Sequence, residues 1–578
     1  MSDRYLPTPL RRALEKAVRQ ARDVAEEGAR DAIQRLGVAD GKAPPYLNDA
    51  EKDLRRRLRA HARALGNGFD RAAETQETKR LVEATAYAHW HRMLFARFLA
   101  ERDLLRHPQH DVPVTLADCR ELAEEEGLPD GWAVAERYAA AMLPGVFRLD
   151  DPVLAVEFDP VHTQALNRLV TDLDASVFEA EDSLGWTYQF WRAAEKDTVN
   201  KSGVKIGADE LPAVTQLFTE PYMVRFLLHN TLGAWWAGKV LAADPALAQT
   251  AADEIELRAA CSLPDYNFEM LRFVREGDDG PWRPAAGTYP GWPKEAKAIT
   301  MLDPCCGSGH FLTEALAILA ALRQAEEHLS PADAIATVLR DNLHGLEIDG
   351  RCVQIAAFAV ALTAWRIGGW QTLPLPHIAW VGAPPPLPKR DFVALADGDA
   401  ELEYALAALH DLFAQAPVLG TLLEPAGGDL FEAEKLRMIE RLLTPLLAKA
   451  RKAEPEQVEG VVAARGMADA AALLHRTYVL QSTNVPYLGR GKQDQALADY
   501  ISRRFEAAKA DLASAMIARM RGLASKGGTY CAVTPQSWTF LGSYQLFRIQ
   551  ILDQQKLDFM CALGSKAFET ISGEVVNT

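Results

Sequence analysis

The sequence has little cysteine and no long apolar run. Its 578 residues include seven cysteines, an odd number, and no two of them form a CxxC pair. This argues against a disulfide framework and a Cys-rich zinc site, and it favours reduced thiols. No apolar stretch reaches the ~20 residues that span a bilayer, and the N-terminal residues lack the apolar core of a secretory signal. We therefore expect a soluble, cytoplasmic protein.

Positive charge is also scarce, because 63 Lys and Arg stand against 79 Asp and Glu, for a net charge of −16. The first 100 residues are the exception, with 20 basic and 14 acidic side chains. An acidic total disfavours a protein that coats nucleic acid, although a local basic surface can still bind phosphates. The cluster Arg55, Arg56, Arg57 and Arg59 is interpreted as a solvated helix face, with a nucleic-acid contact as the alternative.

Two domains are expected, with a boundary at residue 205, and the alternation of short apolar runs with helical segments begins at about residue 296. Residues 1–205 are expected to form a helical domain, in which Leu81–Leu105 carries a buried aromatic face. For residues 206–578 this alternation predicts an α/β domain with a mainly parallel sheet covered on both faces. The predicted strands are Ala298–Leu302, Asn342–Ile348, Arg476–Leu480 and Tyr530–Val533. A Pro-rich and then helical stretch at 368–472 is expected to be an insertion into this domain.

The most informative segment is Asp303–Leu312, with the sequence DPCCGSGHFL. An acid at the end of a strand is followed by Gly307 and Gly309 and then by a helix. Glycine lets the backbone pass close to a ligand because a Cβ atom would collide with it. The carboxylate of Asp303 would repel a phosphate and attract an ammonium group, so this is not a dinucleotide fingerprint.

A second acid, Glu347, ends the next predicted strand in the sequence GLEID. A carboxylate at that position can accept hydrogen bonds from both hydroxyls of a ribose. Asp349 stands directly before a helix, where it suits an N-cap. We therefore assign the ribose to Glu347 and the cap to Asp349.

The third segment is Asn484-Val485-Pro486-Tyr487, shortly after the strand at 476–480. An amide oxygen and a backbone carbonyl in a stiff turn can both accept hydrogen bonds from an exocyclic amino group. The aromatic ring that follows can stack on a base.

In this order the three segments resemble the S-adenosylmethionine-dependent adenine-N6 DNA methyltransferases, whose catalytic motif is (D/N/S)PP(Y/F). Residues 211–233 are similar to the cofactor-binding segment that precedes the glycine loop in that family. Residues 185–191 and 205–211 are similar to the large restriction-modification methylases, including those of BREX- and DISARM-type phage-defence loci. The resemblance implies a Rossmann-like class I methyltransferase sheet preceded by an all-α N-terminal domain. It also implies site-specific methylation of adenine N6 in DNA.

Site residues follow from the resemblance position by position. It implies that S-adenosylmethionine is held by Phe218, Thr219, Asp303, Cys305, Gly307, Gly309 and Glu347. Asn484 and the carbonyl of Val485 would accept hydrogen bonds from adenine N6, and Pro486 would stiffen the turn. Tyr487 would stack on a base flipped out of double-stranded DNA. The family needs no metal, because a sulfonium is already a good leaving group.

Further DNA contacts are expected outside the catalytic turn. Arg490 and Lys492 are candidates for DNA phosphates, and Phe568 stands where the relatives have an aromatic that packs on the flipped base. Residues 489–492 do not form an ATP phosphate loop, because the Gly-x₄ lead and the Ser or Thr after the lysine are missing.

The sequence departs from the family pattern at Val485, where the first proline of the motif is expected, so one fixed φ is lost. A proline at 485 is accordingly expected to be tolerated. The acid that often follows the third strand is not identified, with Asp397 and Asp399 as weak candidates.

Residues 569–576 resemble the last sheet strands of the family, after which the relatives carry a target-recognition region. We therefore expect this chain to bind the cofactor but to need a downstream segment or other defence-system proteins for site-specific methylation. Two alternatives stay open. One is a catalytically degenerate DNA-binding or scaffold subunit, and the other, disfavoured by the long helical region, is a protein glutamine methyltransferase.

Overall fold

The structure is a computed structural model that describes residues 5–144, 146, 151–277, 280–425, 454–564 and 567–568, and the backbone of 576–577. The chain divides into two compact units. The first comprises Met1–Ala194, Pro384–Ala414 and Gly428–Ala468, and the second comprises Glu195–Ala383, Gln415–Gly427 and Asp469–Thr578. Most of the stretch predicted as an insertion into the α/β domain therefore belongs to the unit of the N-terminal helices. Residues 426–453 of that stretch lie outside the described residues.

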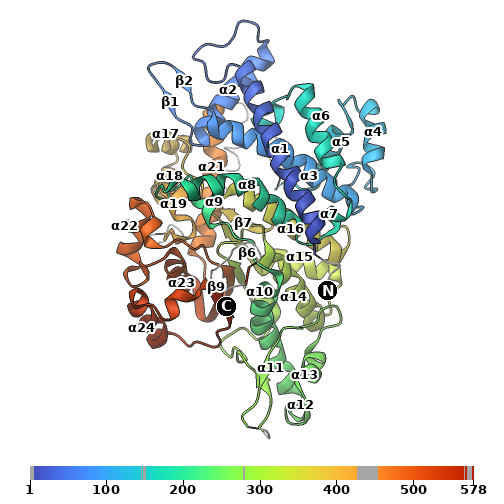
Figure 1. Ribbon diagram of the computed structural model, residues 1–578, viewed down its shortest axis with the longest axis vertical. Helices are drawn as coiled ribbons and strands as arrows, with labels where there is room; N and C mark the ends of the chain where they lie inside the picture. The colour runs from blue at the N-terminus through green and yellow to red at the C-terminus, as the bar shows by residue number, and fades with distance from the viewer. Residues whose placement is uncertain are drawn as a thin grey trace. The chain divides into compact units, whose positions relative to one another are not determined.

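Helices dominate the first unit (Figure 1). Its elements are α1 (Thr8–Arg35), α2 (Asp49–Ala64), β1 (Phe69–Asp70), β2 (Thr75–Gln76), α3 (Lys79–Glu101), α4 (Leu116–Glu125), α5 (Gly131–Met142), α6 (Pro160–Thr171), α7 (Ser176–Glu179), α17 (Lys389–Val393) and α18 (Ala400–Phe413). Helices α8 (Ser183–Ser202) and α21 (Pro455–His475) each contribute to both units. The aromatic face predicted on α3 is buried, with Tyr87, Trp90, Phe95 and Phe98 in the core.

Only part of the arginine cluster of α2 is a solvated face, because two of its four side chains bind backbone carbonyls of the chain. Arg55 is buried, and its guanidinium donates hydrogen bonds to the backbone carbonyls of Gly37 and Asp40. Arg59 donates to the carbonyls of Val38 and Asp40. Carbonyl oxygens that follow α1 have no helical partner of their own, so the arginines satisfy them. Of the four predicted arginines, these two stabilise a loop.

The second unit carries the sheet and its helices. Before the sheet come α9 (Leu211–Thr215), α10 (Pro221–Leu228), a π-helix (His229–Gly233), α11 (Ala234–Ala243), α12 (Pro245–Thr250), α13 (Glu254–Cys261), β3 (Phe273–Val274) and β4 (Arg283–Pro284). The sheet and its connections comprise β5 (Met301–Asp303), α14 (His310–Glu327), α15 (Pro331–Asp341), β6 (Leu343–Glu347), α16 (Gly350–Gly368), β7 (His377–Trp380), α19 (Ala416–Leu419), β8 (Tyr478–Asn484), α22 (Gln495–Arg504), α23 (Leu512–Leu523), β9 (Ala524–Pro535), α24 (Gln545–Gln554), β10 (Ala562–Gly564) and β11 (Val576–Asn577).

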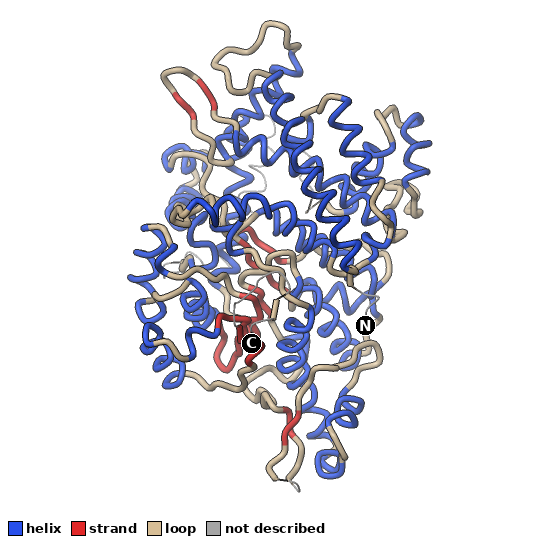
Figure 2. The backbone as a smooth tube through the Cα atoms, viewed as in Figure 1, coloured by secondary structure: helices blue, strands red, loops and turns tan. Residues whose placement is uncertain are grey.

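The sheet has the order β10-β11-β9-β8-β5-β6-β7. The five strands from β9 to β7 are parallel to one another, β11 is antiparallel to β9, and β10 is antiparallel to β11. Consecutive residues of β5, β6 and most of β8 are all buried. Because successive side chains point to opposite faces, both faces of these strands must be covered. Figure 2 shows the strands in red among blue helices.

The strands differ from the predicted ones mainly at β7, β8 and β9. β8 runs from Tyr478 to Asn484 rather than from 476 to 480, so Asn484 ends the strand instead of following it. β7 lies within the Pro-rich stretch that was assigned to the insertion, and it pairs with β6 from His377 to Trp380. β9 is much longer than the predicted run, since it includes Gly527 and Gly528. Prolines around β7 and glycines inside β9 are unfavourable in strands, so the local sequence did not indicate strand β7 or the full length of β9. The segment 569–575, expected to contain the last strands, lies outside the described residues.

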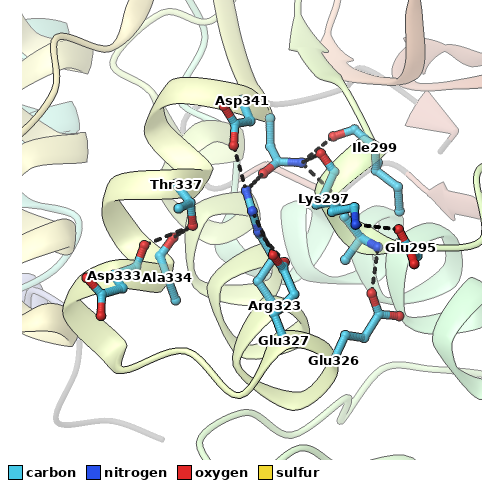
Figure 3. A network of polar contacts seen from close by, with 12 residues as sticks. Glu295, Lys297, Ile299, Arg323, Glu326, Glu327, Asp333, Ala334, Thr337 and Asp341 are labelled. Atoms are coloured by element: carbon cyan, nitrogen blue, oxygen red, sulfur yellow. Dashed lines mark hydrogen bonds and ion pairs between the residues drawn. The ribbon is translucent and has the colours of Figure 1, made fainter.

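A buried arginine fixes the amino-terminal ends of β5 and β6 (Figure 3). Arg323 of α14 is paired with Glu327 and Asp341, and it also donates to Asn342 Oδ1. The Asn342 side-chain amide in turn donates to the carbonyl of Ile299, two residues before β5. The network therefore joins two helices and two strands at the end of the sheet opposite to Asp303 and Glu347.

Within the described residues, no single helix is both long and apolar enough to cross a membrane. The consecutive stretches Ala400–Phe413 and Ala416–Leu422 reach that apolar length only when they are counted together.

Candidate active site

Three predicted site residues end three adjacent strands of the sheet. Asp303 ends β5, Glu347 ends β6 and Asn484 ends β8. These strands are neighbours in the order β8-β5-β6 and run parallel, so their carboxyl ends lie at one edge. The chain goes from β5 to β6 on one side and returns to β8 on the other, which makes β5/β8 a topological switch point. Open parallel sheets bind ligands at such a crevice.

The loop after β5 contains two glycines with positive φ, Gly307 at 51° and Gly309 at 90°. They serve different purposes. A Cβ at 309 would lie 3.0 Å from the Cα of Ala356, so this glycine lets the loop pack on α16. A Cβ at 307 would meet no atom of the described chain within 4 Å. The space beside Gly307 is therefore the part of the loop that a ligand can approach.

Glu347 is buried and tied to the same loop. Its Oε2 accepts a hydrogen bond from the Gly307 N–H at 2.8 Å, and its Oε1 accepts from the N–H groups of Ile348 and Asp349. Burial raises the pKa of Glu347 to about 7, although the three N–H groups oppose the rise. The predicted cap is also present, because Asp349 accepts from the N–H of Arg351 at the start of α16.

Asp303 is 1% exposed and only partly satisfied. Its Oδ1 accepts from the Cys305 N–H at 3.2 Å, and the buried Thr483 hydroxyl lies within reach of the carboxylate, but Oδ2 has no hydrogen bond of good geometry among the described residues. Burial raises the pKa of Asp303 to about 7, and the nearby charge of Glu347 adds to the rise. A buried acceptor without a donor costs about 1–3 kcal/mol. Such an oxygen suits a donor brought by a ligand. Burial also raises the pKa of the Cys305 thiol, so this side chain is neutral.

The turn at residues 484–487 is fixed by contacts from both sides. The Tyr487 hydroxyl donates to Asn484 Oδ1 at 2.8 Å, and Asn484 Nδ2 donates to Thr219 Oγ1 at 3.1 Å. The N–H of Val485 donates to the carbonyl of Val533 at 3.4 Å, which prolongs the ladder between β8 and β9. A proline at 485 has no N–H to donate. The structure thus gives a reason against the expectation that proline is tolerated there.

The segment before α10 connects the turn with the glycine loop. Thr219 is buried, and its carbonyl lies 3.3 Å from Nδ1 of His310, the first residue of α14. The ring of Phe218 meets His310 edge-on at 4.6 Å between centroids. Sequence reasoning placed Phe218 and Thr219 against the cofactor but missed the contact of Thr219 with Asn484. No local pattern indicates it, because 265 positions separate the two residues.

The candidate DNA contacts fall into two groups. Arg490 and Lys492 are exposed shortly after the turn at residues 484–487, where the carbonyl of Lys492 accepts a hydrogen bond from the N–H of Ile206. Phe568 is 4% exposed and belongs to the apolar core of the second unit. In this arrangement its ring does not face an open site, so its predicted contact with a base requires the ring to leave the core. Among the described residues, no cluster of three His, Cys, Asp or Glu side chains could hold a metal ion.

Two curated proteins are similar to this chain. Adenine-specific methyltransferase PglX of Lacticaseibacillus casei (strain Zhang) is 26% identical over 630 residues, which cover 98% of this chain and 50% of that protein. Adenine-specific methyltransferase BrxX of Escherichia coli O9:H4 (strain HS) is 29% identical over 437 residues, 72% of this chain and 34% of that protein. The predicted resemblance to adenine-specific methyltransferases is thus confirmed. The chain spans half or less of the length of these relatives.

Other comparisons add little. No family model matches the chain. Among solved structures, the cryo-EM structure of the DrdV–DNA complex covers 99% of this chain and 42% of that chain, with a TM-score of 0.45 and 13% identity. The ATP-dependent Type ISP restriction-modification enzyme LlaBIII bound to DNA gives a TM-score of 0.41. These TM-scores are too low for a conclusion about a shared fold.

Proposed function

We propose that this chain transfers a methyl group from S-adenosylmethionine to the N6 amino group of adenine in DNA, within a restriction-modification or phage-defence system. The observation that carries the proposal is the placement of Asp303 and Asn484 on neighbouring strand ends at the switch point of the sheet. The Asp303 carboxylate can bind a cationic cofactor, and the Asn484 amide oxygen can accept a hydrogen bond from an amino group. The names of the two curated relatives support the same reaction.

The site fits the proposed cofactor in three ways. Gly307 leaves open space beside the loop, Asp303 Oδ2 lacks a donor of good geometry among the described residues, and Glu347 supplies a second carboxyl group. In the proposed arrangement Asp303 accepts from the ammonium of the methionine part, and Glu347 accepts from the ribose. Bound S-adenosylmethionine supplies a methyl group on a positively charged sulfur. Two carboxyl groups that ionise near neutral pH favour that charge.

The proposed chemistry of the chain is positioning and electrostatics. Asn484 Oδ1 and the carbonyl of Val485 would accept the two hydrogens of adenine N6. Their partial negative charge would stabilise the positive charge that develops on this nitrogen as it attacks. Tyr487 would stack on the base, which must leave the duplex because its amino group is otherwise out of reach.

The proposal extends to the fold and to the partners. We assign the second unit to the Rossmann-like class I methyltransferase fold, since a parallel sheet with a central switch point and antiparallel strands beyond β9 suits that assignment. Double-stranded DNA is the proposed substrate, with Arg490 and Lys492 on its phosphates. Because the relatives are at least twice as long, we propose that base-edge recognition depends on a further region or partner protein.

Tritium transfer from labelled S-adenosylmethionine into DNA, RNA or protein tests the function directly. We expect label in DNA, and N6-methyladenine as the product. Label in protein would instead support a glutamine methyltransferase. Cofactor binding without any transfer, also in the presence of a longer relative's recognition region, would support a degenerate scaffold subunit.

The variant Asn484→Ala separates binding from chemistry. It should leave the affinity for S-adenosylmethionine nearly unchanged in calorimetry and lower methyl transfer by about a hundredfold or more. Gln554→Ala is a control, because this carboxamide lies in the same unit, is exposed and accepts from Arg521 instead. Wild-type turnover in Asn484→Ala would show that the active site has been assigned wrongly.

A further inference from the structure

Asn484 has a hydrogen-bond partner at each end of its carboxamide, and both partners are side chains of the candidate site. The Tyr487 hydroxyl donates to Oδ1 at 2.8 Å, and Nδ2 donates to the hydroxyl oxygen of Thr219 at 3.1 Å. All three residues belong to the second unit. The oxygen that the proposed reaction needs as an acceptor is therefore occupied by a donor of the chain itself.

We infer that the Tyr487 hydroxyl is a stand-in donor that the adenine amino group displaces, and that Thr219 is the positioning residue that holds the Asn484 carboxamide in place throughout this exchange. The inference rests on the proposed function, because it concerns the acceptor oxygen of that reaction. It adds a second task to Tyr487, beyond stacking, and a task to Thr219 that does not involve the cofactor.

The exchange follows from the geometry of carbonyl oxygens. Donors to such an oxygen lie near the plane of its group. A Tyr487 ring stacked flat on the base cannot keep its hydroxyl in the plane where the base's own amino group approaches Asn484 Oδ1. Without any donor, however, this part-buried oxygen would lose its hydrogen bond and be costly to desolvate. The Tyr487 hydroxyl donates to Asn484 Oδ1 until the base arrives. The hydrogen bond from the adenine amino group then replaces the one from Tyr487.

Thr219 is suited to hold the amide because its own position is fixed. Its carbonyl faces His310 at the start of α14, and the neighbouring Phe218 ring packs edge-on against the same histidine. The Thr219 hydroxyl can accept from Nδ2 or donate to Oδ1, so by itself it fixes the position of the carboxamide rather than its orientation. If the carboxamide turned over, Nδ2 would point its hydrogens toward the incoming amino group. Two donors facing each other repel, so with the base bound only the orientation with Nδ2 on Thr219 and Oδ1 toward the base keeps both hydrogen bonds.

The first test measures kinetics on duplex DNA that lacks N6-methyladenine, at saturating cofactor and with a longer relative's recognition region present. Tyr487→Phe keeps the ring and removes the competing hydroxyl, so the KM for DNA should fall about three- to tenfold. Thr219→Val frees the amide, so kcat should fall about tenfold or more with little change in KM for DNA, and Thr219→Ser should restore it. Tyr500→Phe is the matched control, since its hydroxyl bonds the carbonyl of Leu422. A raised KM in Tyr487→Phe, or no rescue by serine, would overturn the inference.

The second test needs no activity. Double-mutant cycles between Asn484→Ala and either Tyr487→Phe or Thr219→Val are measured by urea unfolding of the whole chain without ligands. Each hydrogen bond should appear as a coupling that changes the unfolding constant about fivefold. Absence of both couplings would refute the inference even if DNA is methylated. Couplings in a chain that methylates nothing under any condition would instead count against the proposed function.

Discussion

The N–H of Gly307 donates a hydrogen bond to Oε2 of Glu347 over 2.8 Å. This contact joins the glycine loop after β5 to the end of β6, so the two proposed cofactor elements are not independent. With three backbone N–H groups on its carboxylate, Glu347 holds the loop in place as well as offering its remaining lone pair to a ligand. Loop shape and ligand affinity should therefore change together.

We expect Glu347→Gln to lower the affinity for S-adenosylmethionine by at least about tenfold in calorimetry. A carboxamide has only one oxygen, so its NH₂ group would face an N–H donor and break part of the anchor. Asp349→Asn is the control, because asparagine caps a helix as well as aspartate does. Equal affinities in the two variants would contradict a loop-anchoring role of Glu347.

Cofactor affinity should depend on pH near neutrality. Burial raises the pKa of both Asp303 and Glu347 to about 7, above the ~4 of unfolded chains. A cationic ligand prefers the ionised forms, so affinity should fall about tenfold per pH unit for each group that becomes protonated below pH 7. Calorimetry between pH 6 and 8 measures this, and Asp303→Asn should weaken binding and flatten the slope.

The same pKa shifts determine whether the free energy of unfolding rises or falls with pH. Between the unfolded values and pH 7 the folded chain binds more protons than the unfolded chain does. Without ligand, these two groups therefore make the chain less stable as the pH rises from 5 to 8. Saturating cofactor should cancel that loss, which thermal unfolding in both conditions can check. Stability that rises with pH by the same amount in wild type and Asp303→Asn would argue against the assignment.

The two glycines of the loop should separate folding from binding. Gly309→Ala brings a Cβ to 3.0 Å from the backbone of α16 at φ 90°, so it should lower the free energy of unfolding by about 2 kcal/mol. Gly307→Ala meets open space at φ 51°, so it should cost only about 1 kcal/mol but reduce cofactor affinity more strongly. Urea unfolding and calorimetry on both variants test this contrast.

Arg323 should contribute to stability far more than its neighbour Arg340, although both pair with Asp341. The Arg323 side chain is 4% exposed and that of Arg340 is 61% exposed. Removing one member of a buried ion pair costs about 3–5 kcal/mol, whereas exposed pairs contribute about 0–1 kcal/mol. Arg323→Leu and Arg340→Leu, compared by urea unfolding, should therefore differ by at least about 2 kcal/mol.

Proline at 485 should not improve this protein. Val485→Pro removes the N–H that donates to Val533, so we expect a loss of about 1 kcal/mol in the free energy of unfolding. Pro486→Ala, the control, leaves that hydrogen bond in place. A more stable Val485→Pro variant would show that the gain in stiffness outweighs the lost bond.

Much of the site could be predicted because its signals are local. A carboxylate or amide at a strand end, next to glycines or a proline, is visible within ten residues of sequence, and parallel strands place their carboxyl ends at one edge whatever the connections between them. This is why the sequence alone singles out Asp303, Glu347 and Asn484, and the structure places each at the end of a strand. The aromatic face of α3 was equally visible, since helical spacing repeats every few residues.

The tertiary structure decided the rest, because it depends on residues far apart in the chain. β7 forms a strand because it pairs with β6. Arg55 is buried because its guanidinium binds a backbone carbonyl after α1. Thr219 reaches Asn484 across 265 positions, and Val485 finds its acceptor on β9. Hydrogen bonds form between atoms that the fold brings within about 3 Å, and short-range propensity carries no information about such distances.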